Sequence, residues 1–380
     1  MGIRVWFAAS SVSAAIVLII AAVADYRTEW RTHQLEYRER ALAMEREFSV
    51  RELLKNMEIG IHQEYLEELG RVDRCVTCHL GIENPKMADV PQPLKSHPGF
   101  LLKSHPPQRF GCTICHGGQG LATDSREAHG QVSNWDRPLR EPIQIEAACG
   151  TCHRQGKLDN AERLNEGRTL FQQFGCVGCH RVWARGLHVG PDLSRLAEKD
   201  FTGDHRVDLE DWEWNIQHLI DPRSKVQRSF MPGFGFDRNQ ATALAVFLYS
   251  LSDRSVAASY WPPDRPEIVP RSRIDSGYEV FLEYGCAGCH GVKGKGGVLN
   301  ANSQSGGQVP ALTKLREGYL KEALIQKIKE GARTEKADPK GINPPLHMPA
   351  WRGEIGDEKL DLLADYLFSL APQTKDDWDE

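Results

Sequence analysis

The sequence is dominated by a five-residue pattern, Cys-x-x-Cys-His, which occurs five times in 380 residues and uses all ten cysteines. Two thiols one helical turn apart can each bond a vinyl group of a haem while the next residue presents imidazole to the iron, so this pattern is the attachment signature of c-type haem. The fifteen residues are Cys75, Cys78, His79, Cys112, Cys115, His116, Cys149, Cys152, His153, Cys176, Cys179, His180, Cys286, Cys289 and His290.

Other uses of cysteine do not explain this pattern. A disulfide framework needs no histidine after every second cysteine, and a zinc ribbon pairs its Cys-x-x-Cys units without always adding one. The sequence therefore predicts five covalently bound haem c groups, which would supply the redox chemistry of the chain. His79, His116, His153, His180 and His290 would be both attachment residues and proximal iron ligands.

Composition sets bounds on fold and partners. A chain of 380 residues is long enough for two or three domains. Its net charge of −5 gives no basic field of the kind that nucleic-acid binding requires, so that class of partner is excluded. Hydrophobic residues make up 40% of the chain, and we expect the macrocycles to supply much of the remaining apolar core.

Residues 1–25 are predicted to form a transmembrane anchor. An uncharged, mostly apolar stretch runs from Val5 to Ala24, long enough to cross the hydrocarbon core of a bilayer as a helix. The Ala-Val-Ala that ends at residue 24 also fits a signal-peptidase site, but the apolar run is longer than that of a usual secretory signal. We therefore expect a single uncleaved span.

Residues 26–72 are predicted to form a helical stalk. Apolar side chains recur there at three- and four-residue steps on an otherwise charged segment without proline. An unbroken helix of this length would extend about 70 Å, although Gly60 could interrupt it. The apolar stripe would pack either on the chain's own haem domain or against a partner subunit.

Residues 73–160 are predicted to form a trihaem domain, because three motifs follow one another with no long periodic segment between them. Each iron needs a sixth ligand, and the segment contains three histidines outside the motifs. We expect His97, His105 and His129 to be these distal ligands, without assigning each to a haem. His62 is a reserve, and Met87 is an alternative ligand with no supporting pattern.

An internal repeat follows, in residues 163–253 and 272–372. The segment from Gly167 to Cys176 matches that from Gly277 to Cys286 at an offset of 110 residues, and each copy closes with an apolar helix, at 241–251 and 360–370. The prolines between residues 262 and 270 form a stiff linker. The chain is therefore predicted to end in two duplicated single-haem domains.

Both repeats resemble class I cytochrome c domains. Loops with Pro191 and Pro310 match that family's proline loop, whose carbonyl orients the proximal imidazole. The resemblance implies that Met231 and Met348, each followed by proline, are the sixth iron ligands. The trihaem section resembles compact bis-histidine multihaem cytochromes more loosely. The remaining histidines of the repeats are expected to be ordinary residues, although the last could compete for iron: His188, His205, His218 and His347.

The predicted fold is mainly α, with a transmembrane helix, a stalk helix, a loop-rich trihaem section and two class I cytochrome c helical domains. Methionine ligation raises a haem potential relative to bis-histidine ligation, so electrons should run from the anchor toward the carboxyl terminus. Five distal ligands suffice for five irons, and we therefore expect no catalytic residue. Since c-type haem is attached outside the cytoplasmic membrane in bacteria, the haem domains are expected on the periplasmic side of the inner membrane.

The whole arrangement is similar to the cytochrome c subunits of bacterial quinol-oxidising complexes, of the cytochrome b/Rieske or alternative complex III type. This resemblance implies integral membrane quinol-oxidising subunits and a periplasmic acceptor protein as partners. Two alternatives are an anchored quinol dehydrogenase with its own quinol site, resembling the tetrahaem family, and a peroxidase-like haem enzyme or sensor that loses a methionine ligand on reduction. The acidic tail, residues 376–380, is expected to be a solvated terminus.

Overall fold

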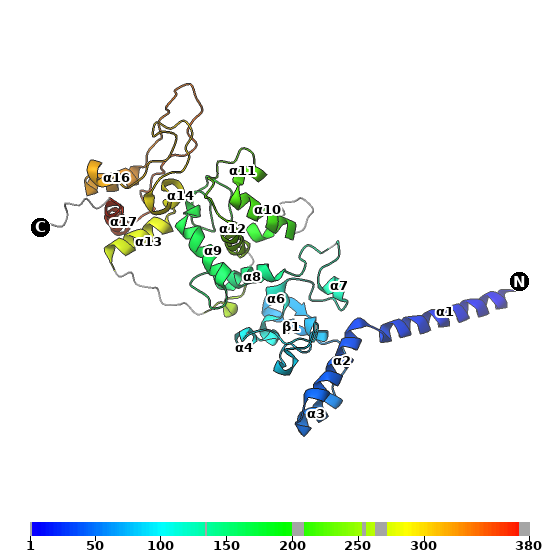
Figure 1. Cartoon of the computed structure of the whole chain (residues 1–380). Coiled ribbons are helices and arrows are strands. Elements are labelled where there is room, and N and C mark those ends of the chain that lie inside the picture. The colour runs from blue at the N-terminus through cyan, green and yellow to red at the C-terminus, as the bar shows by residue number, and fades with distance from the viewer. Residues whose placement is uncertain (1, 134, 200–208, 253–255, 263–271, 372–380) are drawn as a thin grey trace. The chain divides into compact units, whose positions relative to one another are not determined.

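The computed structural model describes residues 2–133, 135–199, 209–252, 256–262 and 272–371 (Figure 1). Helices dominate the described chain, which confirms the mainly α fold class. The chain divides into two compact units, Met1–Pro142 and Ile143–Glu380, and each is described by itself. Several residues singled out in the sequence lie outside the described part: His205, the linker prolines Pro263, Pro266 and Pro270, and the acidic tail at 376–380.

The first unit begins with a long apolar helix, α1 (Ile3–Tyr26). Its segment Ile3–Ala24 has the length and composition needed to cross a membrane, and no part of it is buried within the protein. Side chains such as Phe7 and Leu18 are exposed along it. The helix expected from the apolar run is therefore present, with its apolar surface free to face lipid.

The segment predicted to be a stalk is not one long helix. It consists of α2 (Glu29–Met44) and α3 (Phe48–Lys55), followed by an antiparallel hairpin of β1 (Glu64–Leu66) and β2 (Arg71–Asp73) with Glu64 opposite Asp73. The break comes at Glu45, well before Gly60. There the Glu45 carboxylate accepts the backbone N–H groups of Arg46 and Glu47 at 2.8 and 3.0 Å, which is how acidic side chains compete with a helix for its own donors.

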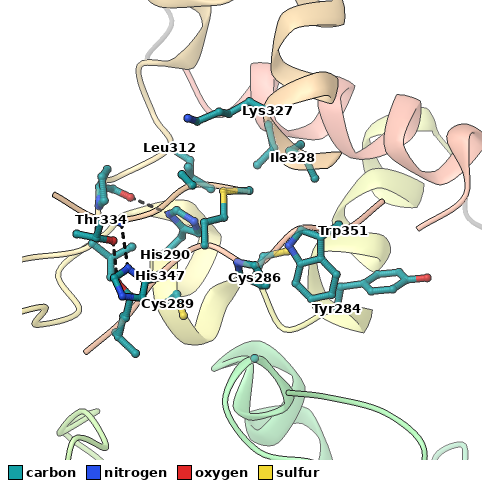
Figure 2. A pocket seen from close by; sticks show the side chains of 18 of the residues that line it. Tyr284, Cys286, Cys289, His290, Leu312, Lys327, Ile328, Thr334, His347 and Trp351 are labelled. Atoms are coloured by element: carbon teal, nitrogen blue, oxygen red, sulfur yellow. Dashed lines mark hydrogen bonds between the residues drawn. The ribbon is translucent and has the colours of Figure 1, made fainter. Parts of the chain in front are cut away.

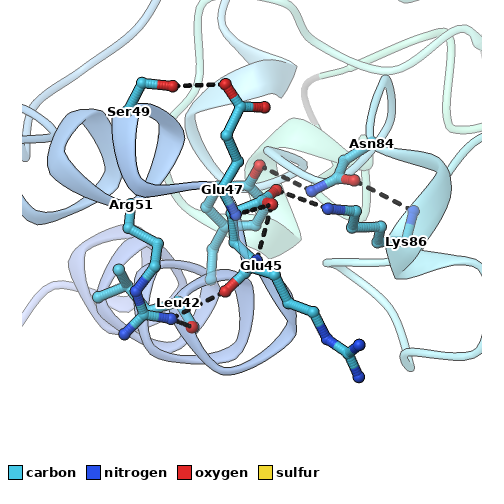
Figure 3. A network of polar contacts seen from close by, with 9 residues as sticks. Leu42, Glu45, Glu47, Ser49, Arg51, Asn84 and Lys86 are labelled. Carbon is cyan, nitrogen blue, oxygen red and sulfur yellow. Dashed lines mark hydrogen bonds and ion pairs between the residues drawn. The ribbon is translucent and has the colours of Figure 1, made fainter.

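A polar network holds α2 and α3 against the loop that carries η3 (Pro85–Met87) (Figure 3). Lys86 Nζ lies 2.6 Å from the Glu45 carboxylate, and the Arg51 guanidinium donates to the carbonyls of Leu42 and Glu45. Beneath it, Ala41 of α2 packs in one apolar cluster with Met87, Val90 and Leu94. These contacts favour the first of the two alternatives for the apolar stripe, packing on the chain's own unit.

The ion pair between Glu45 and Lys86 predicts a pH dependence. The hydrogen bond from Lys86 lowers the pKa of Glu45 from 4.5 to about 2. A lowered carboxyl pKa adds stability that is fully present above pH 4.5 and is lost as the pH falls toward 2. The difference in unfolding free energy between the native chain and Glu45→Gln should therefore shrink over this range in urea titrations. Glu52→Gln, which removes an exposed pair within α3, should have little effect at any pH.

The rest of the first unit is made of short elements joined by loops, as expected for a section with few long periodic segments. The helical turns η2 and α6 carry the first two haem motifs. The elements are η1 (Glu67–Leu69), η2 (Cys75–Thr77), α4 (Leu101–Ser104), α5 (Pro107–Phe110), α6 (Thr113–His116), α7 (Ser125–Ala128) and, at the boundary of the unit, η4 (Pro142–Gln144).

The second unit contains the third motif and both repeats. The third motif lies on α8 (Ile145–Cys152), which packs against α9 and α12 of the first repeat. The further elements of the first repeat and the segment after it are α9 (Glu162–Gln173), η5 (Cys176–Gly178), η6 (Leu196–Glu198), α10 (Leu209–Ile220), α11 (Pro222–Lys225), α12 (Arg238–Tyr249) and η7 (Ala258–Tyr260). The second repeat comprises α13 (Arg273–Glu283), α14 (Ala287–His290), η8 (Val292–Gly294), α15 (Leu315–Gly318), α16 (Lys321–Glu330) and α17 (Asp357–Ser369).

Each repeat is held together by a close crossing of its first and last helices. A Cβ on Gly277 of α13 would lie 2.1 Å from the carbonyl oxygen of Leu362 in α17, and one on Gly167 of α9 would lie 2.0 Å from that of Ala243 in α12. Aromatic rings flank the crossing of α13 and α17, where the ring centroids of Phe281 and Tyr366 are 5.3 Å apart. Glycine is therefore required at both positions because the facing backbone occupies the space of a side chain.

This crossing predicts a stability effect. Gly277→Ala should lower the free energy of unfolding by roughly 1–3 kcal/mol, because the added methyl group forces α13 and α17 apart. Gly318→Ala is the matched control, since a Cβ there meets nothing within 4 Å. Urea unfolding monitored by circular dichroism gives both values. Equal stabilities of the two variants would contradict the close crossing.

Candidate haem sites

The first two motifs meet at one buried carboxylate. Asp73, at the end of β2, is only 1% exposed. Its Oδ1 accepts the backbone N–H of Cys75 at 3.1 Å, and its Oδ2 accepts those of Cys112 and Thr113 at 2.7 and 2.8 Å. One side chain thus satisfies donors at the start of both attachment turns, which fixes the two turns relative to each other.

Asp73 keeps its charge in this position. Burial alone would raise the pKa of the Asp73 carboxyl, but the hydrogen bonds from Cys75, Thr113 and Cys112 outweigh it and hold this pKa below its ordinary value. The thiols of Cys75 and Cys112 lie beside the carboxylate and close to each other. Both thiols belong to Cys-x-x-Cys-His motifs, so we interpret this cluster as the contact between two haem-attachment sites.

Two of the histidines predicted to be distal ligands lie beside motif histidines in the first unit. The ring centroids of His79 and His129 are 6.3 Å apart, and those of His116 and His97 are 6.2 Å apart. Two imidazoles that bind one metal from opposite sides, each at the ~2.0–2.1 Å typical of metal–nitrogen bonds, hold their centroids roughly 6–6.5 Å apart. Both pairs therefore fit a haem iron between them.

The protonation of these rings also suits iron binding. Burial lowers the pKa of His79 and of His116, which keeps both imidazoles neutral near pH 7. His97 Nδ1 lies 2.9 Å from the carbonyl oxygen of Pro98 and would donate to it, which leaves Nε2 as the free acceptor nitrogen.

His105, a predicted distal ligand, and Met87, the alternative ligand, both pack against apolar side chains. The ring of His105 packs on Phe110 at 4.9 Å, and its Nδ1 lies 3.0 Å from Ser104 Oγ. Met87 is completely buried in the apolar cluster with Ala41. Its thioether therefore fills core space, which gives no support to Met87 as an iron ligand.

The third motif is built into the base of the first repeat. Helix α8 ends at Cys152, and the backbone N–H of His153 closes the turn onto the Cys149 carbonyl at 2.9 Å. The Arg168 side chain of α9 donates to the carbonyl of His153. A Cβ on Gly150 would lie 2.3 Å from that of Ser250, so the motif packs tightly on the end of α12.

The proline loops of both repeats hydrogen-bond to the motif histidines, which confirms the predicted contact. His180 Nδ1 lies 2.8 Å from the Pro191 carbonyl oxygen, and His290 Nδ1 lies 2.9 Å from that of Pro310. Burial lowers the pKa of both histidines. Each ring is therefore a neutral imidazole that donates from Nδ1 and can offer Nε2 to a metal.

A cavity of about 420 Å³ lies beside the proximal histidine of the second repeat. Figure 2 shows Cys286, Cys289 and His290 there, together with a hydrogen bond between His347 and the neighbouring Thr334. The lining is mostly apolar and includes Met348. An apolar cavity with two thiols, an imidazole and a thioether on its wall has the chemistry that a covalently bound haem requires.

Backbone hydrogen bonds hold the methionine loop of the second repeat in place. Met348 exchanges two hydrogen bonds with Ala332, at 2.9 and 3.0 Å. His347 Nδ1 accepts the backbone N–H of Thr334 at 3.0 Å, which occupies one nitrogen of the ring that could compete for iron. In the first repeat, Met231 packs against the apolar core, and its backbone N–H donates to Ser229 Oγ at 3.2 Å.

Sequence reasoning missed Asp73. The only signal was an acidic residue two positions before Cys75, and such a residue is ordinarily solvated. Its role depends on Cys112 and Thr113, which lie 39 and 40 residues further along the chain.

Comparison with known proteins agrees with this geometry. Residues 164–252 and 274–371 each match the family model for cytochrome c. The chain carries two cytochrome c domains. Domains of this family imply covalently bound haem c and a role in electron transfer. No solved structure matches the chain.

Curated relatives extend the similarity beyond one domain. The chain is 29% identical to a cbb3-type cytochrome c oxidase subunit, FixPc, of Rhizobium leguminosarum bv. viciae, over 57% of the chain and 66% of the relative. It is 25% identical to a cbb3-type subunit, CcoP, of Helicobacter pylori, over 57% and 61%. Cytochrome c oxidase subunit 2 of Alkalihalophilus pseudofirmus is 32% identical over 23% of the chain and 25% of the relative. The chain thus spans less than two thirds of the length of these relatives.

Proposed function

We propose that this chain is a membrane-anchored electron-transfer subunit that carries electrons from a quinol-oxidising complex to a periplasmic acceptor through five haem c groups. The observation that carries the proposal is the presence of five Cys-x-x-Cys-His motifs, with two histidine pairs in the first unit spaced for bis-histidine ligation. The apolar helix α1 supports a membrane anchor. The part of the chain that the structure describes contains one candidate span, and one span cannot build a quinol site of the multi-helix type, so the proposal requires an integral membrane partner.

The histidine geometry extends the proposal to individual ligands. His79 and His129 would bind the iron of the haem on Cys75 and Cys78, and His116 and His97 that of the haem on Cys112 and Cys115. Met231 and Met348 would complete the irons of the two cytochrome c domains, and His105 stays among the proposed distal ligands. The resulting order places bis-histidine haems before methionine-ligated ones, which favours electron flow toward the carboxyl terminus.

A second candidate follows from the relatives. Two of them are named as subunits of cbb3-type oxidases, which favours a role as a cytochrome subunit of a terminal oxidase. The two candidates differ in the direction of electron delivery relative to the membrane complex. The first gives electrons from the complex to a soluble acceptor, and the second gives electrons to the complex.

Purification from native membranes in mild detergent tests both candidates. We expect five c haems per chain, together with stoichiometric b haem and quinol-dependent reduction of the c haems. Co-purified copper with oxygen reduction would replace the first candidate by the second. Five c haems with no partner, after crosslinking before extraction, would contradict both.

The ligand assignment predicts the effect of two histidine variants. His129→Ala should open the iron of the haem on Cys75, and His97→Ala that of the haem on Cys112, because alanine supplies no ligand. Each variant should gain one high-spin ferric signal in electron paramagnetic resonance and one carbon monoxide site in the reduced state. His188→Ala is the control and should gain neither, because its ring contacts Arg181. Unchanged spectra in His129→Ala and His97→Ala would contradict the pairing.

A further inference from the structure

The two cytochrome c domains touch through the backbones of their haem motifs. A Cβ on Gly178 would lie 2.1 Å from the carbonyl oxygen of Gly285, and one on Gly288 would lie 2.3 Å from that of Gly175. The reverse contacts are equally tight, because a Cβ on Gly285 would lie 2.2 Å from the nitrogen of Gly178. Four glycines thus form a reciprocal contact in which each domain presents the same two positions.

These glycines occupy equivalent places in the two motifs. Gly175 and Gly285 precede the first cysteine and have φ values of +64° and +67°, which favour glycine for backbone reasons. Gly178 and Gly288 precede the second cysteine and have no such requirement, so the space taken by the facing backbone is what excludes a side chain. The other three motifs have Thr77, Ile114 and Thr151 at this place. The small residue therefore occurs where the two motifs meet.

The contact brings together the attachment residues themselves. The thiol of Cys179 lies within hydrogen-bonding reach of that of Cys289. Gly178 and Leu187 of the first domain also line the cavity of the second, and the green ribbon of the first domain passes beside Cys286 and Cys289 in Figure 2. No charged or bulky side chain is among the atoms that Gly175, Gly178, Gly285 and Gly288 approach most closely.

We propose that this glycine contact is an electron-transfer junction, which would hold the haem on Cys179 close to the haem on Cys289. One electron would cross it in either direction, so that one iron changes from ferrous to ferric while the other changes from ferric to ferrous. No bond is made or broken and no proton is needed. The proposal rests on the haem attachment of the proposed function and adds the route between the last two sites.

The junction differs from ordinary domain packing in what it predicts for a small substitution. A methyl group at Gly178 or Gly288 adds apolar surface, which ordinary packing of exposed domains accommodates by a slight shift. At a junction, the same shift would move the two haem-attachment motifs apart and would slow electron transfer between their haems. The two haem sites themselves should remain intact, because both substitutions leave the cysteines, histidines and methionines in place.

The test uses the full chain loaded with haem, as the native protein, Gly178→Ala, Gly288→Ala and the control Gly318→Ala, whose added Cβ meets open space. Pulsed electron paramagnetic resonance measures the separation of the two methionine-ligated ferric irons. Rapid photoreduction measures the rate at which these two haems exchange an electron. Haem content and midpoint potentials establish that each site is loaded and unchanged.

We expect a longer iron–iron separation and a slower exchange in both motif variants, with native values in Gly318→Ala. Native separation and native rate in Gly178→Ala and Gly288→Ala, with full haem content, would overturn the junction while leaving the proposed function intact. Missing haem in the native chain would instead overturn the proposed function. If one motif variant fails to fold, the other provides the same comparison from the opposite side of the contact.

Discussion

Asp73→Ala is expected to remove the haems of the first two motifs from the mature chain. The substitution leaves the N–H groups of Cys75, Cys112 and Thr113 without their acceptor, and each buried group left unpaired costs about 1–3 kcal/mol. Their sum is a large share of the ~5–15 kcal/mol that stabilises a typical domain. Haem content, measured by the pyridine haemochrome assay and by mass spectrometry of peptides, should fall at both motifs together.

A matched control separates this effect from the loss of any capping carboxylate. Asp124 accepts the backbone N–H groups of Arg126 and Glu127 at the start of α7, but it is exposed. Asp124→Ala should therefore cost only about 1 kcal/mol and keep all haems. Full haem content in Asp73→Ala, or loss at only one of the two motifs, would contradict the shared role of this carboxylate.

Met348→His is expected to lower the midpoint potential of the haem in the second cytochrome c domain. Exchange of a thioether for an imidazole favours the ferric state, and the shift should be roughly 0.1 V or more, within the ~0.8 V range that axial ligands span. Redox potentiometry followed by visible absorption would resolve this haem as one that moves from the high-potential to the low-potential group.

Met87→Leu is the corresponding control. Met87 is fully buried in the cluster with Ala41, Val90 and Leu94, and leucine has a similar volume, so all midpoint potentials should stay at their native values. A potential that moves in Met87→Leu would make Met87 a ligand. Native potentials in Met348→His, with the haem in place, would remove Met348 from the ligand set.

Features that depend on short stretches of sequence could be predicted. The haem motifs and the proline loops each consist of neighbouring residues, and each copy of the repeat can be recognised within one continuous stretch. The contact of His180 with Pro191 joins residues only eleven positions apart. The apolar run of α1 has the same property, since helix formation in lipid depends on length and composition. In all these cases the local sequence contains the information that determines the contact.

Features that depend on distant residues could not be predicted. Helix α2 ends at Met44 because Glu45 turns away from helical geometry and pairs with Lys86, 41 residues later. His129 lies 50 residues after His79, and nothing in the spacing distinguishes it from His97 as the partner of that ring. Such pairings depend on how loops close around the haems, which periodicity does not encode.

The position of the third motif on α8 has a consequence for how such chains can be rearranged. Counted along the sequence, the motifs form a group of three and a group of two, but α8 shares a core with α9 and α12. Recombination between Pro142 and Ile143 would cut no compact unit and would exchange three attachment sites at once. A crossover placed a few residues after His153 would instead divide a hydrophobic core. Modular evolution of this chain would therefore proceed in blocks of two and three Cys-x-x-Cys-His motifs, with the boundary between the blocks ahead of α8.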